Sequence, residues 1–313
     1  MSRMSRMSRL AFAVAAVLVF AAPAGAALQP GEHASVDVAV ATLWKAPDLY
    51  RPIDRPSVTN PVDLEAWNRN LSTTASRVWL DSHVQTQALY GQEVVVLARS
   101  GAWAKVAVVD EPDPQDPHGY PGWLRAAQLA PDFDRSGAQV VVTSRTSKLL
   151  VHGRTIPLSY GTVLPLERWS GGSAVVRTPD GQGTAVGVAP ALEPSAATVV
   201  SQAKRFVGLR YLWGGLSAWG FDCSGLVWDV FRVQGMTVPR DADPQFHHGT
   251  PVARSALRPG DLLFWGSKHY ADHVAIYAGN GQMVEAPDSA HSVRVVPVRW
   301  DAYYLGARRY LSG

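Results

Sequence analysis

Cysteine is almost absent from this sequence of 313 residues, which contains only Cys223. With no second cysteine, the chain cannot form an internal disulfide. Runs of lysine or arginine are also missing, which argues against nucleic acid as a partner. Five histidines fall between residues 247 and 291, but they show none of the usual zinc-ligand spacings, and cysteine ligands are lacking. We therefore expect no bound metal and no cofactor.

An apolar run near the N-terminus is too short to span a bilayer. It covers about 13 residues, from Leu10 to Ala22, and Ala24-Gly-Ala26 follows with the small residues of a signal-peptidase site. Three arginines precede it: Arg3, Arg6 and Arg9. The pattern predicts a signal peptide over residues 1–26, a secreted, periplasmic protein and no membrane contact after cleavage; the alternative is an uncleaved anchor. Without these arginines the 29 basic residues fall to 26, equal to the 26 acidic ones.

Cys223 lies in the segment Phe221-Asp-Cys-Ser-Gly-Leu-Val227. Apolar residues recur on one face after it, which predicts a helix that begins at or just after the cysteine. Unpaired N–H groups and the helix dipole at such a start stabilise a thiolate. A lone cysteine is more often a small buried apolar residue, but an unpaired thiol is unusual in an exported protein. We therefore predict that Cys223 is a nucleophile.

A base for this thiolate is found fifty residues further on, in Asp272-His-Val-Ala-Ile-Tyr-Ala-Gly279. The pattern predicts a strand that begins at His273 and ends in a glycine-rich turn. A histidine on a strand that faces a nucleophile at a helix tip is the cysteine–histidine arrangement. An antiparallel hairpin would return Glu285 beside His273, where its carboxylate could accept the Nδ1–H bond. His291 is the alternative third member.

The region before the cysteine contains short strands and turns. The pieces Gly91-Gln-Glu-Val, Trp103-Ala-Lys-Val and Gly122-Trp-Leu resemble a bacterial SH3-like barrel. A second, more degenerate copy runs from about residue 139 to 191, which predicts an internal repeat. We expect four segments: the signal peptide (1–26), an N-terminal segment with the first barrel (27–131), the second barrel (135–193) and a C-terminal domain (196–313).

Three ordered motifs of the C-terminal domain resemble the NlpC family of bacterial cell-wall cysteine peptidases. They are FDCSGLV at 221–227, RPGDLLFW at 258–265 and HVAIYAG at 273–279. The resemblance implies a papain-like fold, so the expected fold class is α+β, with two small all-β SH3-like barrels before the peptidase domain. It also implies catalytic roles for Cys223, His273 and the residue at 285. Many relatives carry histidine at that third position, where this chain has Glu285.

Further pieces look like the γ-D-glutamyl-L-diamino acid endopeptidases of the dipeptidyl-peptidase VI type. They are Val40-Ala-Thr-Leu-Trp-Lys45, Gly119-Tyr-Pro-Gly-Trp123 and the terminal peptidase itself. In those enzymes the amine of an N-terminal L-Ala is bound beside the nucleophile, and the first barrel narrows the site. The resemblance implies substrate-binding roles for Asp222, Ser224, Tyr211 and Tyr120. A carboxylate can pair with an ammonium, but Asp222 could instead be a helix N-cap, and the tyrosines could be ordinary packing residues.

The sequence therefore predicts an enzyme that cleaves the bond between γ-D-Glu and a diamino acid, either diaminopimelate or Lys, in peptidoglycan stem peptides or muropeptide fragments. Cleavage would proceed through a thioester on the cysteine. Two alternatives remain open. One is an amidase or acyltransferase on the same scaffold. The other is a non-catalytic wall-binding protein whose barrels carry the function.

Overall fold

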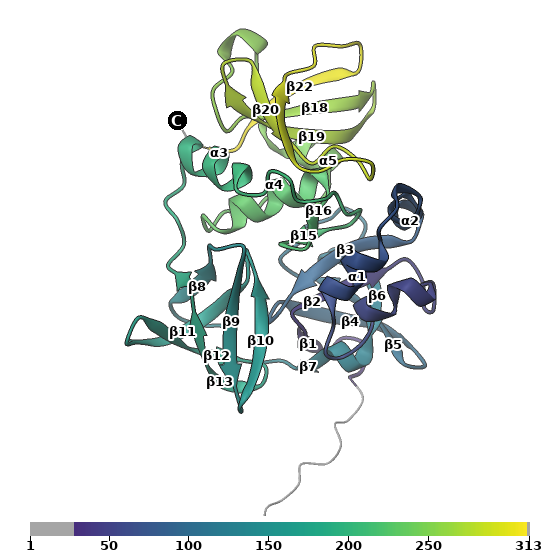
Figure 1. Ribbon diagram of the computed structural model, residues 1–313, viewed down its shortest axis with the longest axis vertical. Helices are drawn as coiled ribbons and strands as arrows, with labels where there is room; N and C mark the ends of the chain where they lie inside the picture. Colours follow the sequence, from purple (N-terminus) through teal and green to yellow (C-terminus); the bar gives the residue numbers. More distant parts are fainter. Residues whose placement is uncertain (1–27, 312–313) are drawn as a thin grey trace, which may run out of the picture.

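The computed structural model describes residues 28–311, so the predicted signal peptide lies outside the described residues. Two all-β units lie side by side below a C-terminal α+β unit (Figure 1). The chain passes through them in order, from the first sheet to the second and then to the C-terminal unit. The expected α+β class, with two small all-β units before a C-terminal unit of helices and an antiparallel sheet, is confirmed. The predicted segment boundaries remain predictions.

The first unit is a seven-stranded sheet with the order β3-β2-β6-β5-β4-β1-β7. Alternating apolar side chains on these strands bury one face, as the period of a half-buried strand requires. Its strands are β1 (His33–Val36), β2 (Val40–Trp44), β3 (Val84–Leu89), β4 (Glu93–Ser100), β5 (Trp103–Val108), β6 (Tyr120–Arg125) and β7 (Leu129–Pro131). Short helices fill the long connection after β2: η1 (Pro52–Ser57), α1 (Leu64–Asn70), α2 (Thr74–Val78) and η2 (Trp79–Ser82).

The second unit repeats the strand order of the first. Its order is β10-β9-β13-β12-β11-β8-β14, so adding seven to each strand number of the first sheet reproduces it. The strands are β8 (Gln139–Val142), β9 (Thr146–Val151), β10 (Arg154–Ser159), β11 (Val163–Ser170), β12 (Ser173–Thr178), β13 (Gly181–Val186) and β14 (Val188–Ala189). The internal repeat predicted from sequence is therefore present in the topology.

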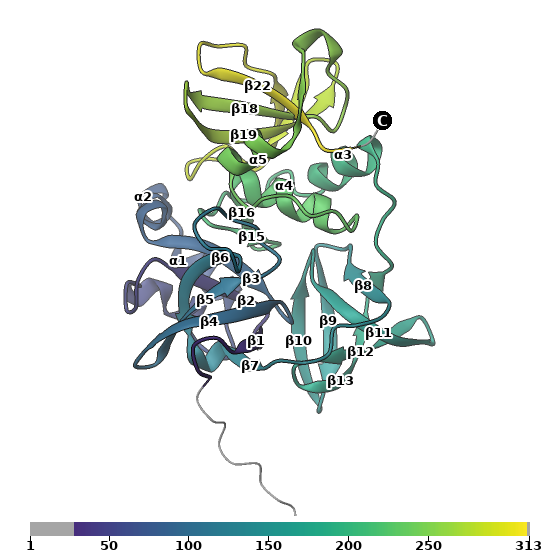
Figure 2. The ribbon, with the colours of Figure 1, turned by 180° about the vertical axis from the view of Figure 1, so that it is seen from behind.

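The C-terminal unit packs helices against an antiparallel sheet with the order β17-β22-β18-β19-β20-β21. Figure 2 shows α3 and α4 between this sheet and the two all-β units. The helices are α3 (Ala196–Lys204), α4 (Cys223–Arg232) and α5 (Ala242–His248), with a short η4 (Arg254–Ala256). The strands are β15 (Leu216–Ser217), β16 (Gly220–Phe221), β17 (Thr250–Val252), β18 (Leu262–Ser267), β19 (Tyr270–Gly279), β20 (Gln282–Glu285), β21 (Arg294–Pro297) and β22 (Tyr304–Arg309).

The first sheet supports the loop that precedes α4. The side-chain oxygen of Gln87 in β3 accepts hydrogen bonds from the backbone of Leu216 and the hydroxyl of Ser217. Gly214 lies so close to β3 that an added Cβ would be 2.6 Å from a methyl group of Val84. One apolar cluster also joins buried side chains of all three units. Helix α4, which begins at Cys223, is therefore positioned by the first sheet as well as by its own unit.

Candidate active site

Cys223 is the first residue of α4, as the motif predicts, and only 9% of the residue is exposed. Asp222 is the N-cap, and its carboxylate accepts the backbone N–H of Gly225 at 2.6 Å. The motif needs glycine at 225, because a Cβ there would lie 2.1 Å from the carbonyl oxygen of Gly215. The thiol thus lies at the start of a helix, beside the unpaired N–H groups of its first turn.

The structure brings His273 to Glu285, but through a different ring nitrogen from the one expected. His273 Nε2, not Nδ1, lies 2.8 Å from Glu285 Oε2. The contact arises because β20 pairs antiparallel with β19 after a tight turn at Asn280 and Gly281, both with positive φ. Nε2 is therefore taken by Glu285, and the nearby side chain of Cys223 raises the pKa of His273.

Strand β19 begins at Tyr270, three residues before the predicted start at His273. Pairing with β18 extends it, because Ser267 and Tyr270 are partners across the ladder. His273 therefore lies inside the strand rather than at its tip. Strand pairing on both sides of the histidine's segment, with β18 and β20, holds the backbone of the proposed base.

Two opposing effects act on the pKa of His273. Burial lowers it, but hydrogen bonds and charge interactions with Cys223 and Glu285 raise it, and the pKa reaches about 9. For Glu285 the signs are reversed. Burial raises the pKa of this carboxyl, but His273 and two neighbouring arginines outweigh burial and lower the pKa to about 2. At neutral pH this arrangement holds an imidazolium beside a carboxylate. A positively charged imidazole is a suitable partner for a thiolate.

The two arginines beside Glu285 are not predicted from the sequence. Arg294 Nη2 lies 2.8 Å from Glu285 Oε1, and Arg299 Nη1 lies 3.0 Å from Oε2. Arg294 is directly opposite Glu285 in the ladder between β20 and β21, so a cross-strand pair is the signal that could have found it. The alternative third residue, His291, pairs instead with Asp288 at 2.7 Å, and about half of its side chain is exposed.

A buried arginine, Arg240, contacts Asp222, the residue before Cys223, and is not predicted from the sequence either. Its guanidinium donates to both carboxylate oxygens of Asp222, at 3.0 and 2.7 Å, and to the hydroxyl of Ser224 at 3.0 Å. From the first sheet, Thr86 Oγ1 accepts its Nε–H at 2.9 Å. Asp222 therefore already has a cationic partner, so its charge is less available to a substrate amine than expected.

A pocket of about 280 Å³ opens beside Cys223. Tyr211, Asp222 and Ser224 line it from the C-terminal unit, and Tyr120 lines it from the first sheet. The structure thus brings all four predicted substrate-binding residues to one cavity. It adds a fifth, Asp241, whose Oδ2 accepts the Tyr120 hydroxyl at 2.8 Å. Burial raises the pKa of Asp241 to about 6, while Arg240 opposes this effect.

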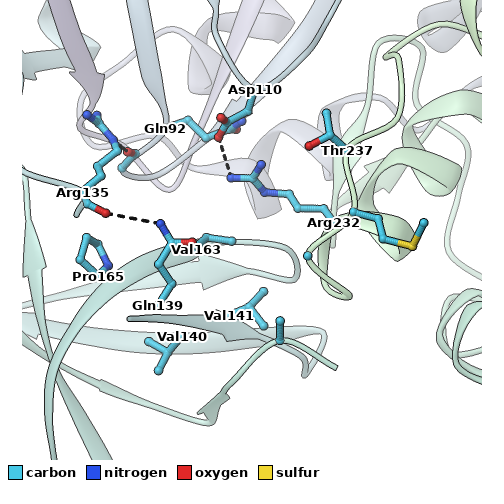
Figure 3. A pocket seen from close by; sticks show the side chains of 14 residues that line it. Gln92, Asp110, Arg135, Gln139, Val140, Val141, Val163, Pro165, Arg232 and Thr237 are labelled. Atoms are coloured by element: carbon cyan, nitrogen blue, oxygen red, sulfur yellow. Dashed lines mark hydrogen bonds and ion pairs between the residues drawn. The ribbon is translucent and has the colours of Figure 1, made fainter. Parts of the chain in front are cut away.

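A second cavity, of about 250 Å³, lies where both sheets meet the C-terminal unit (Figure 3). Across it, Arg232 of α4 pairs with Asp110 of the first unit at 3.0 Å. Its lining contains no cysteine or histidine, whereas Cys223 lines the first pocket. Within residues 28–311, no cluster of three or more histidine, cysteine or acidic side chains could hold a metal ion. Over the same range, no helix is long and apolar enough to cross a bilayer.

Known proteins resemble this chain over most of its length. The model of the NlpC/P60 family matches residues 208–309. Over 89% of this chain and 91% of the relative, the sequence is 39% identical to a γ-D-glutamyl-L-lysine dipeptidyl-peptidase of Bacillus cereus. The chain belongs to the NlpC/P60 family. A Bacillus subtilis protein of the same name is 35% identical over 85% of this chain and 93% of the relative.

A crystal structure of an NlpC/P60 family protein from Bacillus cereus superposes on this chain with a TM-score of 0.85. It is 37% identical and covers 90% of this chain and 100% of its own. The likeness extends through both all-β units, so the NlpC/P60 domain and the units before it form a shared architecture. The chain described here is therefore itself a cysteine peptidase that hydrolyses peptides of peptidoglycan.

Proposed function

We propose that the enzyme cleaves the amide bond between γ-D-Glu and the following diamino acid in muropeptides that carry a free N-terminal L-Ala. The observation that carries this proposal is the pocket beside Cys223, where Tyr120 of the first sheet is hydrogen-bonded to Asp241. Two relatives that match nearly the whole chain are named γ-D-glutamyl-L-lysine dipeptidyl-peptidases, which supports the same bond here.

The proposed chemistry begins with the pair of Cys223 and His273. The thiolate attacks the carbonyl of γ-D-Glu, and the oxyanion is met by backbone N–H at the start of α4, where N–H groups lack helical partners. His273 donates its proton to the leaving amine of the diamino acid, which leaves a thioester on Cys223. His273 then takes a proton from water, and hydroxide attack on the thioester releases L-Ala-γ-D-Glu and regenerates the thiolate beside the protonated imidazole. Glu285 orients the imidazole and stabilises its charged form.

Recognition of the free amine is assigned to the end of the pocket that Tyr120 closes. The ammonium of L-Ala carries three donors, and Asp241 and Asp222 offer carboxylate oxygens near the nucleophile. Arg240 lies 2.7 Å from Asp222 but 3.8 Å from Asp241, so Asp241 keeps more of its charge for the ammonium and takes the larger share of this contact. Tyr211 and Ser224 add hydroxyls as further acceptors.

The test is mass spectrometry of the products from L-Ala-γ-D-Glu-diaminopimelate and L-Ala-γ-D-Glu-L-Lys. We expect the dipeptide of L-Ala and D-Glu, absent when the Cys223→Ala variant replaces the enzyme. Acetylation of the L-Ala amine is expected to reduce kcat/KM at least tenfold, because a charge-assisted hydrogen bond is lost. Cleavage by Cys223→Ala would refute the nucleophile, and equal rates with the acetylated substrate would refute the amine subsite.

We further propose that the enzyme acts after secretion, in the periplasm. The signal-peptide pattern over residues 1–26 supports export, and a substrate with a free L-Ala amine is a released fragment of wall. N-terminal sequencing of the exported protein, with cleavage expected after Ala26, tests this assignment. An N-terminus at Met1 in the exported form would contradict it.

A further inference from the structure

We propose that Lys45 recognises the free α-carboxylate of the D-Glu residue and makes the enzyme select γ-D-Glu stems over stems amidated at that position. The proposal rests on the proposed function, since it assigns a second charged contact in the same pocket. Amidation converts D-Glu to D-isoglutamine and replaces a carboxylate by a neutral carboxamide of the same size. The two substrates therefore differ by one negative charge, and this charge is what Lys45 would recognise.

Lys45 is held at the rim of the pocket by its backbone. It follows β2 directly, and its N–H donates to the carbonyl oxygen of His83, the residue before β3, at 2.9 Å. Its side chain lines the cavity beside Cys223 together with Gln85 and Gln115 of the same unit. The wall that the first unit contributes to the pocket therefore carries a cation on an anchored backbone.

The charges around the pocket leave this cation without an acidic partner. Among the described residues that line the cavity, the other charged side chains are all acidic: Asp222, Asp241 and Asp272. No carboxylate oxygen of residues 28–311 lies within 4 Å of the Lys45 amine, which donates only to the backbone oxygen of Asp81 at 3.4 Å. The carboxylate of Asp81 interacts with Lys45 through charge alone and accepts the Ser289 hydroxyl instead.

Arg240 cannot supply the cation for a substrate carboxylate. It is fully buried, and its guanidinium nitrogens are directed to Asp222, Ser224 and Thr86. Lys45 is exposed and has two of its three N–H donors available. Among the described residues, Lys45 is therefore the cation of this pocket that a substrate can reach.

The acyl half of the proposed substrate matches this distribution of charge. L-Ala-γ-D-Glu carries one ammonium, on L-Ala, and one carboxylate, because the γ-linkage leaves the α-carboxyl of D-Glu free. The ammonium is assigned to Asp241 and its neighbours, and Lys45 is then the remaining group of opposite sign for the carboxylate. A lysine acts here as a mobile point charge rather than a bidentate clamp. Because Lys45 is exposed, we expect about a tenfold effect rather than the larger effect of a buried pair.

The experiment compares kcat/KM for L-Ala-γ-D-Glu-L-Lys and L-Ala-γ-D-isoglutaminyl-L-Lys. We expect the wild-type enzyme to prefer the acidic substrate about tenfold, and Lys45→Met to lose this preference by becoming slower on the acidic substrate only. The matched control is Lys148→Met, the same change at an exposed lysine of the second sheet, which should keep the preference. Raising salt from 0.1 to 0.5 M should shrink the wild-type preference, because the pair is open to solvent.

Other outcomes overturn the assignment separately. Equal wild-type rates on the two substrates, or a full preference in Lys45→Met, would refute the role of Lys45 while leaving the proposed function intact. A third substrate, in which the C-terminal carboxyl of L-Lys is a carboxamide, tests whether Lys45 contacts the leaving diamino acid instead. If Lys45→Met changes the response to that carboxyl and not to D-Glu, the contact belongs to the diamino acid. If the wild-type enzyme releases the dipeptide from no substrate, the proposed function fails and the Lys45 assignment fails with it.

Discussion

Replacement of Glu285 by Gln is expected to shift the alkaline limit of catalysis toward neutral pH. The change keeps the size and one acceptor oxygen of the side chain but removes its charge. His273 reaches a pKa of about 9 only because Cys223 and Glu285 outweigh the effect of burial. In the variant, Arg294 and Arg299 remain close to the site without their shared carboxylate. Their positive charges then disfavour the imidazolium.

The size of the effect follows from the pKa of His273. The rise from 6.5 to about 9 corresponds to about 3 kcal/mol in favour of the charged ring. This is a net value, because burial acts in the opposite direction. If Glu285 supplies even half of it, its loss lowers the pKa of His273 by at least about 1 pH unit. The protonated ring is the acid that the leaving amine needs, so activity is present below this pKa and is lost as pH rises through it.

The assay is kcat/KM from pH 6 to 10 with L-Ala-γ-D-Glu-L-Lys. We expect the wild-type alkaline limb near pH 9 and the limb of Glu285→Gln at least about 1 pH unit lower. Glu285→Asp is the control, since it keeps the charge and should move the limb less. An NMR titration of the His273 ring gives the same pKa without turnover. If Glu285→Gln lowers kcat at every pH but leaves the limb in place, Glu285 only positions the ring and the electrostatic reasoning is refuted.

Three further predictions concern buried charges around the site. Burial raises the pKa of Asp241 to about 6, so KM for a free-amine substrate should rise as pH falls below about 6; Asp241→Asn should abolish this dependence, and its persistence would exclude Asp241. Arg240→Met leaves the buried carboxylate of Asp222 without its partner and should cost roughly 3–5 kcal/mol in urea unfolding; a loss below 1 kcal/mol would contradict the pairing. Burial raises the pKa of Asp229 well above its usual value, so its contribution to stability is complete at acidic pH and is lost as pH rises. Asp229→Asn should unfold at higher urea than wild type at pH 8 but not at pH 4, and equal midpoints at pH 8 would contradict an ionisation penalty.

The sequence predicts the parts of the site that depend on local spacing. Cys223 lies at a helix start because apolar residues recur after it with helical period. His273 and Glu285 meet because a two-residue turn fixes the register of one hairpin. The internal repeat is also predicted from the sequence, and both sheets use the same strand order. The helix start and the hairpin are each encoded within a short stretch of chain.

The contacts that escape prediction join segments far apart in the chain. Arg240 contacts Thr86 of the first sheet, 154 positions earlier in the chain. No local sequence pattern indicates which acceptors a buried arginine will contact. Asp241 is marked as a pocket residue only by its bond to Tyr120, 121 positions earlier. The expected Nδ1 contact of His273 was wrong for a related reason, because the ring nitrogen that meets Glu285 depends on side-chain orientation.

The position of Arg240 limits how the protein could be rearranged during evolution. Its fully buried guanidinium shares Thr86 with Glu111, and the hydroxyl of Thr86 donates to that carboxylate at 2.6 Å. A peptidase unit transferred to another gene without the first sheet would expose this cation and lose its neutral partner. A foreign barrel in the same place would have to supply both an acceptor for the arginine and a tyrosine for the pocket. The first sheet and the peptidase unit are therefore expected to be inherited together.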